Sequence, residues 1–524
     1  MNQPPPPSPP STPPPERPED CQSEVVTPVK EGWRWSALLG VLGLVMVCFI
    51  GTTVAVFVDI EAAYFEVEVT VPPGLRPVAS HMAATTLAID GQGRAVIWGY
   101  RGHGISGTGV DSVADDAAAS VVALPEGRRI VLLTGGTQDG DEVSDYSYVV
   151  ALDDLGQIWT WGCGTEKTST DYMCGRTISA AAPRNKPGRV DLPDRVVDLK
   201  ASTPTTVVLT AGGEVWTWGN DYHGSAGVGY DAIGTPPRRI LTGIHSIGTG
   251  YWAGWAVAAS GWTYTTYKGT TFTSDPQPQG GLLFWGWQST GQSGGPAGDG
   301  RSAGYYYTPS LVKDDSELSK ALAAGTAAGD DNVTLGVRAG SPDDKGTFQQ
   351  MTGSFYGNQF RLRDGSVFLW GSRSNYAAGT DASTGSISAY LAQHVTLQHL
   401  GLSVSVVQIA TTVNLIFLLD STGTVWMYGQ RNGSPNYPDA NGAYQSTSAS
   451  DVRLPMRIDG GAAHPAWKAG DIVDIVGMGY TVAVRHANGA IWMVGKNTHC
   501  LVRDDIWSNT CNTSDQPPVK VDYY

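Results

Sequence analysis

Residues 206–219, TVVLTAGGEVWTWG, decide the fold because they read as one complete β-hairpin. The first five residues are rich in β-branched side chains, and the Ala-Gly-Gly that follows supplies the positive φ of a tight turn. In the second strand, Val215 and Thr217 point to one side, whereas Trp216 and Trp218 point to the other. The paired indoles indicate a strand with one buried face.

The same pattern recurs along the chain, which makes the hairpin a repeat. Six further copies end at Gly99, Gly162, Gly286, Gly371, Gly429 and Gly495. From Gly99 to Gly495 is 396 residues in six intervals, a mean period of 66, which is long enough for four antiparallel strands. Because a four-stranded repeat cannot bury both faces alone, the copies must stack on one another. The sequence therefore predicts an all-β fold, a seven-bladed β-propeller of four-stranded antiparallel blades.

Large side chains alternate with others at the end of each hairpin, and we expect them to fill the spaces between blades. The pairs at positions i and i+2 are Val96/Trp98, Trp159/Trp161, Trp216/Trp218, Leu283/Trp285, Phe368/Trp370, Trp426/Tyr428 and Trp492/Val494. Glycine-rich turns follow several hairpins, as in RGHGISGTG (101–109) and NDYHGSAGVG (220–229).

A hairpin that ends in Trp-Gly and leads into a glycine-rich turn resembles the repeat of the regulator of chromosome condensation family. The resemblance covers roughly residues 78–524. That family includes nuclear exchange factors for a small GTPase, and similar secreted bacterial propellers act as protein inhibitors. The resemblance, taken with the amino-terminal segments, implies a bacterial membrane-anchored type. It carries over no catalytic or contact residue, because only the blade framework matches.

The composition excludes one class of partner. The chain has 524 residues, a net charge of -15 and a pI near 5.0. Nucleic-acid binding is not expected, because phosphate recognition requires clustered Lys and Arg. No cofactor is predicted either, since the GxGxxG motif at 102–107 opens no helix.

Three segments precede the propeller, which is predicted to occupy residues 78–524. Residues 1–35 are rich in proline and are predicted to be a disordered cytoplasmic tail. Residues 36–58 contain a run of 22 uncharged residues, which as a helix would cross a hydrocarbon layer of about 30 Å; a cleaved signal peptide is the alternative. Residues 59–77 are expected to form a juxtamembrane stalk or a strand that helps to close the propeller.

Charges next to the apolar run predict its orientation. Lys30 and Arg34 precede it, whereas acidic residues follow it, and positive residues stay on the cytoplasmic side. We therefore expect a single-pass cell-membrane protein with a cytoplasmic amino terminus and an extracytoplasmic propeller.

Four cysteines lie in two loops that each follow the end of a repeat hairpin. Cys163 and Cys174 are eleven residues apart, as are Cys500 and Cys511. Four cysteines allow three pairings, of which the local bridges Cys163–Cys174 and Cys500–Cys511 are the simplest. Disulfides suit an oxidising exterior. A metal site is the alternative, although neither loop contains a CxxC motif.

Aromatic residues are unusually dense in residues 251–307, where thirteen of 57 residues are aromatic. Within this stretch, an insertion at 260–281 opens the turn of the fourth hairpin. The insertion carries the candidate binding residues Trp262, Tyr264, Tyr267 and Phe272. Exposed rings there would contact a protein or stack on a sugar ring. The alternative is that the insertion buries its own rings.

Motifs for catalysis and metal binding give little support for either function. GxSxG occurs at 291–295 and 300–304, but in a glycine-rich loop rather than at the strand-to-helix turn that a nucleophile requires. The chain is therefore not expected to be an enzyme. The turn that contains Asp139, Asp141 and Asp145 is a secondary calcium candidate, and a solvated acidic turn is the simpler interpretation.

These observations predict a membrane-anchored propeller at the cell surface that binds a protein or glycan in recognition, adhesion or an envelope scaffold. One alternative is a structural subunit of a surface assembly, which would associate with itself. The other is a polysaccharide-acting enzyme, which would need two carboxylates close together in one pocket.

Overall fold

The computed structural model describes residues 46–50 and 53–57, and 74–521 with gaps. The longer gaps are 138–146, 164–172, 230–234, 266–270, 274–281, 288–303, 312–349, 372–388, 396–404, 430–451, 459–469 and 509–518. The chain divides into two units, Met1–Glu66 and Val67–Tyr524, which are described separately.

The described part of the first unit is a β-hairpin. Strand β1 (Met46–Ile50) pairs antiparallel with β2 (Thr53–Phe57), with Ile50 opposite Thr53. These residues differ from the helix predicted over 36–58. Their Val, Ile and Thr content favours strands, and an apolar run alone does not distinguish a helix from a strand. Among the residues that the structure describes, no helix is both long and apolar enough to cross a membrane.

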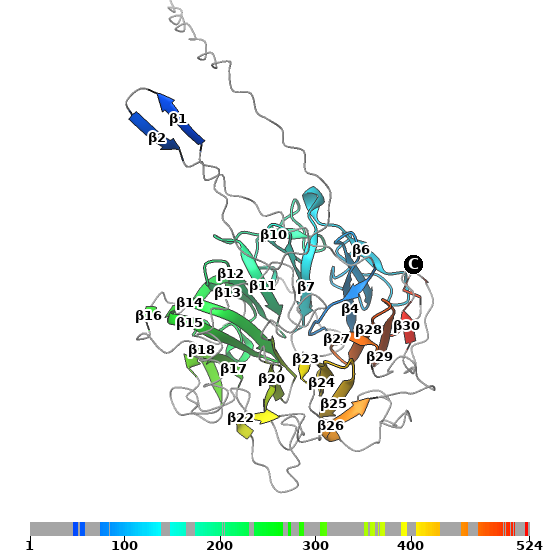
Figure 1. The fold of residues 1–524 in the computed structure, drawn as a ribbon. Coiled ribbons are helices and arrows are strands. Elements are labelled where there is room, and N and C mark those ends of the chain that lie inside the picture. Colours follow the sequence, from blue (N-terminus) through cyan, green and yellow to red (C-terminus); the bar gives the residue numbers. More distant parts are fainter. Residues whose placement is uncertain are drawn as a thin grey trace, which may run out of the picture. The chain divides into compact units, whose positions relative to one another are not determined.

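In the second unit, the described strands form sheets that are antiparallel except for one parallel pairing, Thr249 of β14 with Thr352 of β19 (Figure 1). The first four-stranded sheet contains β3 (Arg76–Pro77), β4 (Thr85–Ile89), β5 (Ala95–Gly99) and β6 (Ser120–Val122). The second contains β7 (Ile130–Gly136), β8 (Tyr148–Asp153), β9 (Ile158–Gly162) and β10 (Gly188–Val190). The third contains β23 (Val406–Thr411), β24 (Leu415–Asp420), β25 (Val425–Gly429) and β26 (Val452–Ile458). The fourth contains β27 (Ile472–Met478), β28 (Thr481–His486), β29 (Ile491–Gly495) and β30 (Val519–Val521).

The strands between the second and third of these sheets belong to one larger sheet of twelve strands in the described part of the chain. They are β11 (Val196–Ala201), β12 (Thr205–Thr210), β13 (Val215–Gly219), β14 (Thr235–Gly250), β15 (Ala253–Thr265), β16 (Thr271–Thr273), β17 (Leu282–Trp287), β18 (Tyr305–Leu311), β19 (Gln350–Gly353), β20 (Gly357–Arg361), β21 (Val367–Gly371) and β22 (Ala389–Val395). Strand β14 is shared, because residues 235–241 pair with β13 and residues 241–250 pair with β15. One continuous strand therefore joins β11–β13 to β15–β18.

An aspartate closes the turn of several repeat hairpins. Asp420 Oδ1 accepts hydrogen bonds from the backbone N–H groups of Thr422 at 2.8 Å and Thr424 at 3.0 Å, and Gly423 has a φ of 78°. Its Oδ2 accepts the indole N–H of Trp426 at 2.9 Å. The side chain thus replaces backbone partners in the turn, which explains why the sequence forms a hairpin there.

We expect Asp420→Ala to lower the free energy of unfolding by about 2 kcal/mol, because several donors lose their acceptor in a buried turn. Asp90 makes the same turn contacts through the N–H groups of Gln92 and Arg94, but it is partly exposed and bonds no indole. Asp90→Ala should therefore cost less than about 1 kcal/mol. Urea unfolding of both variants measures the difference, and equal losses would contradict the role of the buried indole contact.

The second large side chain of the hairpin pairs is buried between sheets where the structure describes it. Trp98, Trp161, Trp218, Trp285 and Tyr428 are all buried. Three of the indoles also donate to a backbone carbonyl of the loop that precedes their sheet in space. The bonds are Trp98 Nε1 to Leu501 O at 2.9 Å, Trp161 Nε1 to Ile105 O at 3.1 Å and Trp285 Nε1 to Ser225 O at 2.9 Å.

The Trp98 contact joins the β3–β6 sheet to the β27–β30 sheet, which come from opposite ends of the unit. Two backbone hydrogen bonds support the same joint, Ala119 N to Ile506 O at 2.7 Å and Gly479 N to Ser80 O at 3.3 Å. Among the described strands, β30 pairs with β29 and β3 with β4. The ring of sheets therefore closes here through loops and side chains.

His81 lies between β3 and β4 and contacts three other strands. Its backbone N–H donates to Gly135 O of β7 at 2.9 Å. Its imidazole is hydrogen-bonded to the backbone of Ala201 in β11 and Gly353 in β19. Burial lowers the pKa of His81 to about 4, although these hydrogen bonds act in the opposite direction. One side chain thus links the first sheet to distant strands of the twelve-stranded sheet.

Candidate binding site on the loop face

Antiparallel order gives the sheets two distinct ends. At one end, which we call the loop face, the third strand of a sheet finishes and the fourth begins, as after Gly99, Gly162, Gly219 and Gly495. At the other end, which we call the turn face, lie the hairpin turns between second and third strands and the links between sheets. Loops carried on rigid sheets are common positions for binding residues.

Six aromatic rings gather on the loop face between β13 and β18. This aromatic cluster consists of His223, Tyr251, Trp252, Trp287, Tyr305 and Tyr307. His223 stacks on Tyr305 with ring centroids 4.6 Å apart and an interplanar angle of 3°. Trp252 meets His223 edge-on at 4.7 Å and Trp287 at 5.3 Å. Such arrangements stabilise the cluster beyond the burial of its surface.

Backbone contacts hold the segments of the aromatic cluster together. Gly229 N donates to Tyr307 O at 2.6 Å, and Trp287 N donates to Trp252 O at 3.0 Å. At Gly224, which follows His223, a Cβ atom would lie 2.9 Å from Tyr306 O, so only glycine permits this approach of loop to strand.

The cluster is neither fully buried nor fully exposed. Tyr305 is 37% exposed, Tyr251 is only 5% exposed, and the other four rings are half-buried. Trp252 also has a φ of 54°, which is unusual and unfavourable for a bulky residue. The backbone of the turn between β14 and β15 is thus strained at a half-buried indole. Backbone strain of this kind is often found at binding sites.

The predicted binding residues lie in a different part of the fold. Trp262 and Tyr264 belong to β15 and Phe272 to β16, with Tyr264 opposite Phe272 across the strands. Part of the insertion therefore extends the sheet toward the turn face. The positions of these three side chains and all of Tyr267 lie outside the described residues, so these candidates stay predictions.

Sequence analysis found only part of the aromatic cluster. The aromatic density of 251–307 included all members of the cluster except His223, but the chosen candidates were those of the insertion. His223 was missed because it comes from the preceding repeat. Its signal was its place in the glycine-rich turn, where His103 stands in an earlier copy with a similar φ of 53°.

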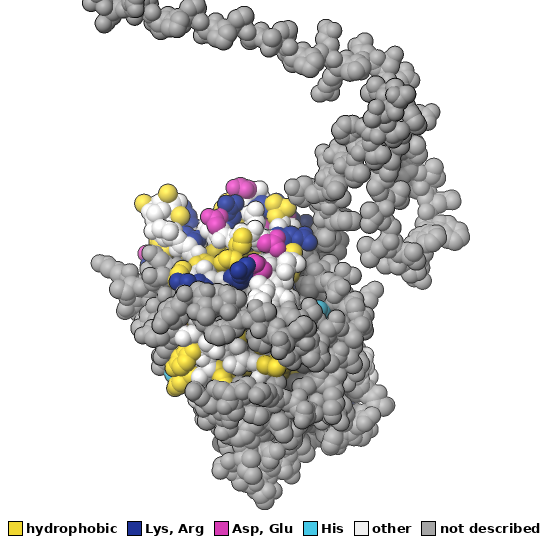
Figure 2. All heavy atoms as spheres, turned by 90° about the vertical axis from the view of Figure 1, so that its left-hand side faces the viewer, with side chains coloured by type: hydrophobic (Ala, Val, Ile, Leu, Met, Phe, Trp, Pro, Cys, Tyr) yellow, Lys and Arg dark blue, Asp and Glu magenta, His cyan; other side chains and the backbone are white. Residues whose placement is uncertain are grey.

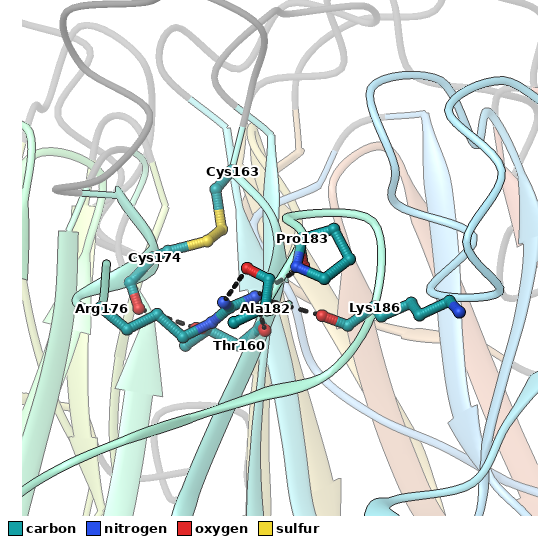
Figure 3. Close-up of a disulfide and its surroundings, with 7 residues drawn as sticks. All are labelled: Thr160, Cys163, Cys174, Arg176, Ala182, Pro183 and Lys186. Atoms are coloured by element: carbon teal, nitrogen blue, oxygen red, sulfur yellow. Dashed lines mark hydrogen bonds between the residues drawn. A yellow bond between two sulfur atoms is a disulfide. The ribbon is translucent and has the colours of Figure 1, made fainter. Parts of the chain in front are cut away.

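A disulfide joins Cys163 to Cys174 on the loop face. The neighbouring Arg176 donates to the backbone carbonyls of Thr160, Ala182, Pro183 and Lys186 at 2.9–3.2 Å (Figure 3). The cystine and the guanidinium together fix this loop on β9. Cys500 is also disulfide-bonded, and Cys511 lies outside the described residues.

Metal binding finds no support among the described side chains, where no group of three or more His, Cys, Asp or Glu is arranged to hold an ion. The secondary calcium candidates Asp139, Asp141 and Asp145 lie outside the described residues. The calcium hypothesis for that turn stays a prediction.

Sheets joined side by side, with large side chains buried between them and loops gathered on one end, define a β-propeller. No family model matches the chain. It is 33% identical over 73 residues to the mouse regulator of chromosome condensation, which covers 14% of this chain and 16% of that protein. It is 24% identical over 153 residues to the Drosophila melanogaster protein of the same name, which covers 29% of this chain and 25% of that protein.

Solved structures share the fold at low sequence identity. Human WBSCR16 superposes with a TM-score of 0.52 and 16% identity over 78% of this chain and 85% of that chain. Prp20p of Saccharomyces cerevisiae, described with its binding to Gsp1p and histones, gives a TM-score of 0.50 and 15% identity over 76% and 79% of the two chains. The chain thus shares the β-propeller fold of these structures, and two segments of it resemble regulators of chromosome condensation in sequence.

Proposed function

We propose that this chain is a protein-binding scaffold that recognises its partner through the aromatic cluster. The observation that carries the proposal is the group of half-exposed rings from His223 to Tyr307, held in place by backbone contacts. Tyr and Trp in partly buried clusters are the residues that dominate protein interfaces. The yeast relative Prp20p binds proteins, namely Gsp1p and histones, and forms a complex with Kap60.

The proposal includes a propeller of seven blades. Four blades are the four-stranded sheets, and three share the twelve-stranded sheet. The first part of β14 serves as the outer strand of one blade and its second part as the inner strand of the next. The aromatic cluster then lies across two adjacent blades that share a strand.

We expect the double change Trp252→Ala and Trp287→Ala to weaken partner capture by at least about tenfold, because central aromatic contacts are each worth about 2 kcal/mol or more. Full-length tagged chain and variant are used to capture partners from envelope extract, and the captured protein is then titrated. Val110→Ala is the control, since this exposed side chain lies between β5 and β6, away from both candidate sites.

Two results would redirect the proposal. Undiminished capture by the double variant, with loss in Trp262→Ala, would move the site to the insertion. Capture of only a second copy of this chain would favour the structural subunit. A carbohydrate-processing enzyme is not proposed, because the relative whose binding is described, Prp20p, binds proteins.

We further propose that the propeller lies outside the cytoplasm and is tethered to the cell membrane by the apolar segment 36–58. What supports this is the Cys163–Cys174 disulfide, which suits an oxidising compartment, and the uncharged run itself. Protease added to intact cells should degrade the propeller and spare the amino-terminal tail. A propeller that resists protease until the cells are lysed would overturn this location.

A further inference from the structure

A groove lies on the turn face, away from the aromatic cluster. Its larger part is a cavity of about 700 Å³ lined by Pro193, Asp194, Gly212, Glu214, Trp216 and Arg239. A second cavity of about 370 Å³ shares Pro193 and Asp194 with it and continues past Leu155 and Arg189. Both volumes fall within the range of about 300 to 1,000 Å³ that is typical of small-molecule sites.

The indole in this groove is more exposed than two of its equivalents in other repeats. Trp159 and Trp426 occupy the same hairpin position, are only 5% and 8% exposed, and donate to the turn aspartates Asp153 and Asp420. In the β12–β13 hairpin, Thr210 replaces the aspartate, and Trp216 is half-buried at the edge of the cavity. Unlike Trp159 and Trp426, Trp216 therefore has part of its ring at the wall of a cavity, where it can contact a ligand.

Polar groups around Trp216 are held in fixed positions. Glu214 Oε2 accepts the Trp216 indole N–H at 3.0 Å, and its Oε1 accepts from Arg239 Nη1 at 2.6 Å. Asp194 accepts the backbone N–H groups of Gly212 at 2.9 Å and Arg195 at 2.7 Å. Each carboxylate oxygen has a remaining lone pair that can accept a hydrogen bond from a ligand. The arrangement therefore suits the binding of hydroxyl groups.

The backbone around the groove is already paired, which argues against a peptide. Ala211 N donates to Arg195 O, Gly213 N to Thr210 O and Val196 N to Gly156 O, each at 2.8–3.0 Å. A peptide that adds to a sheet edge needs free main-chain donors and acceptors. In this groove, side chains rather than the backbone would therefore bind the ligand.

The charge of the groove argues for an uncharged ligand. Arg189 pairs with Asp191 and Arg239 with Glu214, so positive and negative groups balance along its wall. On the side of the molecule where β14 lies, the described surface likewise shows hydrophobic side chains among charges of both signs (Figure 2). The net charge of -15 further disfavours anionic polymers.

We propose that this groove binds a neutral oligosaccharide. One sugar ring lies against the exposed part of the Trp216 indole. The hydroxyl groups of the sugar donate to Glu214 and Asp194, and Arg239 donates to a ring or hydroxyl oxygen of the sugar. Further sugar units extend into the second cavity toward Leu155, which is 50% exposed. The apolar face of a sugar ring can stack on an indole, and the hydroxyl groups on its rim can form hydrogen bonds with the flanking carboxylates and guanidinium.

The test is isothermal titration of the full-length protein with neutral tetrasaccharides of glucose, mannose and galactose, with oligogalacturonate as the anionic comparison. At least one neutral tetrasaccharide should bind, and Trp216→Ala should weaken it by at least about tenfold, the equivalent of about 1.4 kcal/mol. Trp492→Ala is the matched control, because Trp492 is half-buried at the same repeat position in β29.

Arg239→Ala is a second variant that keeps the fold, since its side chain is 47% exposed, and it should weaken binding at least about threefold. The absence of binding to every neutral tetrasaccharide would overturn the proposal, as would preference for oligogalacturonate or equal affinity in Trp216→Ala. Variants of the aromatic cluster should leave saccharide binding unchanged. The saccharide proposal and the proposal for the aromatic cluster can therefore fail independently.

Discussion

Replacement of Trp98 by alanine should lower the free energy of unfolding by about 4 kcal/mol, which is typical for a buried Trp that leaves a cavity. The side chain is buried between β5 and the β27–β30 sheet, and its loss also leaves the carbonyl of Leu501 without its indole donor. Equilibrium unfolding in urea, followed by circular dichroism, measures the change.

Trp161→Ala is the matched control for that experiment. Trp161 is equally buried and donates to Ile105 O, but it joins sheets that are neighbours in sequence. Both variants should lose similar stability. If Trp98→Ala lost less than about 1 kcal/mol of stability while Trp161→Ala lost several kcal/mol, the stability of the ring of sheets would not depend on the contact that closes it.

The stability of the protein should fall between pH 7 and pH 4.5 in a way that depends on His81. Burial holds the pKa of His81 at about 4, below its ordinary value of 6.5, so the unfolded chain binds a proton in this range and the folded chain does not. The stabilising effect is complete above pH 6.5 and is lost as the pH falls toward 4. Over this interval, the loss is about 2 kcal/mol.

The variant His81→Gln isolates this effect, because its amide keeps an N–H donor for the backbone of Ala201 or Gly353 but does not titrate. Urea unfolding at pH 7.0, 5.5 and 4.5 gives the difference between parent and variant at each pH. Carboxylates titrate in both proteins and cancel. A difference that does not change with pH would mean that His81 is solvated and titrates normally.

Much of the sheet structure was predictable, because the hairpin signals are local. The positive φ of Gly213, at 74°, comes from the turn that Ala-Gly-Gly predicted, and the burial of Trp218 follows from alternation in one strand. The Cys163–Cys174 disulfide also joins residues that are close in sequence.

Features that depend on contacts between repeats were harder to predict. The repeat predicts blades of four separate strands, but β14 runs from Thr235 to Gly250 through a register shift between Thr242 and Ile244 and serves two groups of strands. A bulge lets one strand bend from one partner to the next, and the sequence gives no local sign of it. The stacking of His223 on Tyr305 likewise depends on how two groups of strands pack.

The way in which the ring closes has a consequence for folding. The Trp98 to Leu501 bond spans 403 residues, whereas the same kind of bond from Trp161 spans 56 and that from Trp285 spans 60. Contacts between distant residues form late, because the intervening chain must first lose its conformational freedom. The apolar surfaces of the first and last sheets therefore stay exposed until the other sheets have assembled. During that interval the chain is most prone to aggregation and most dependent on chaperones.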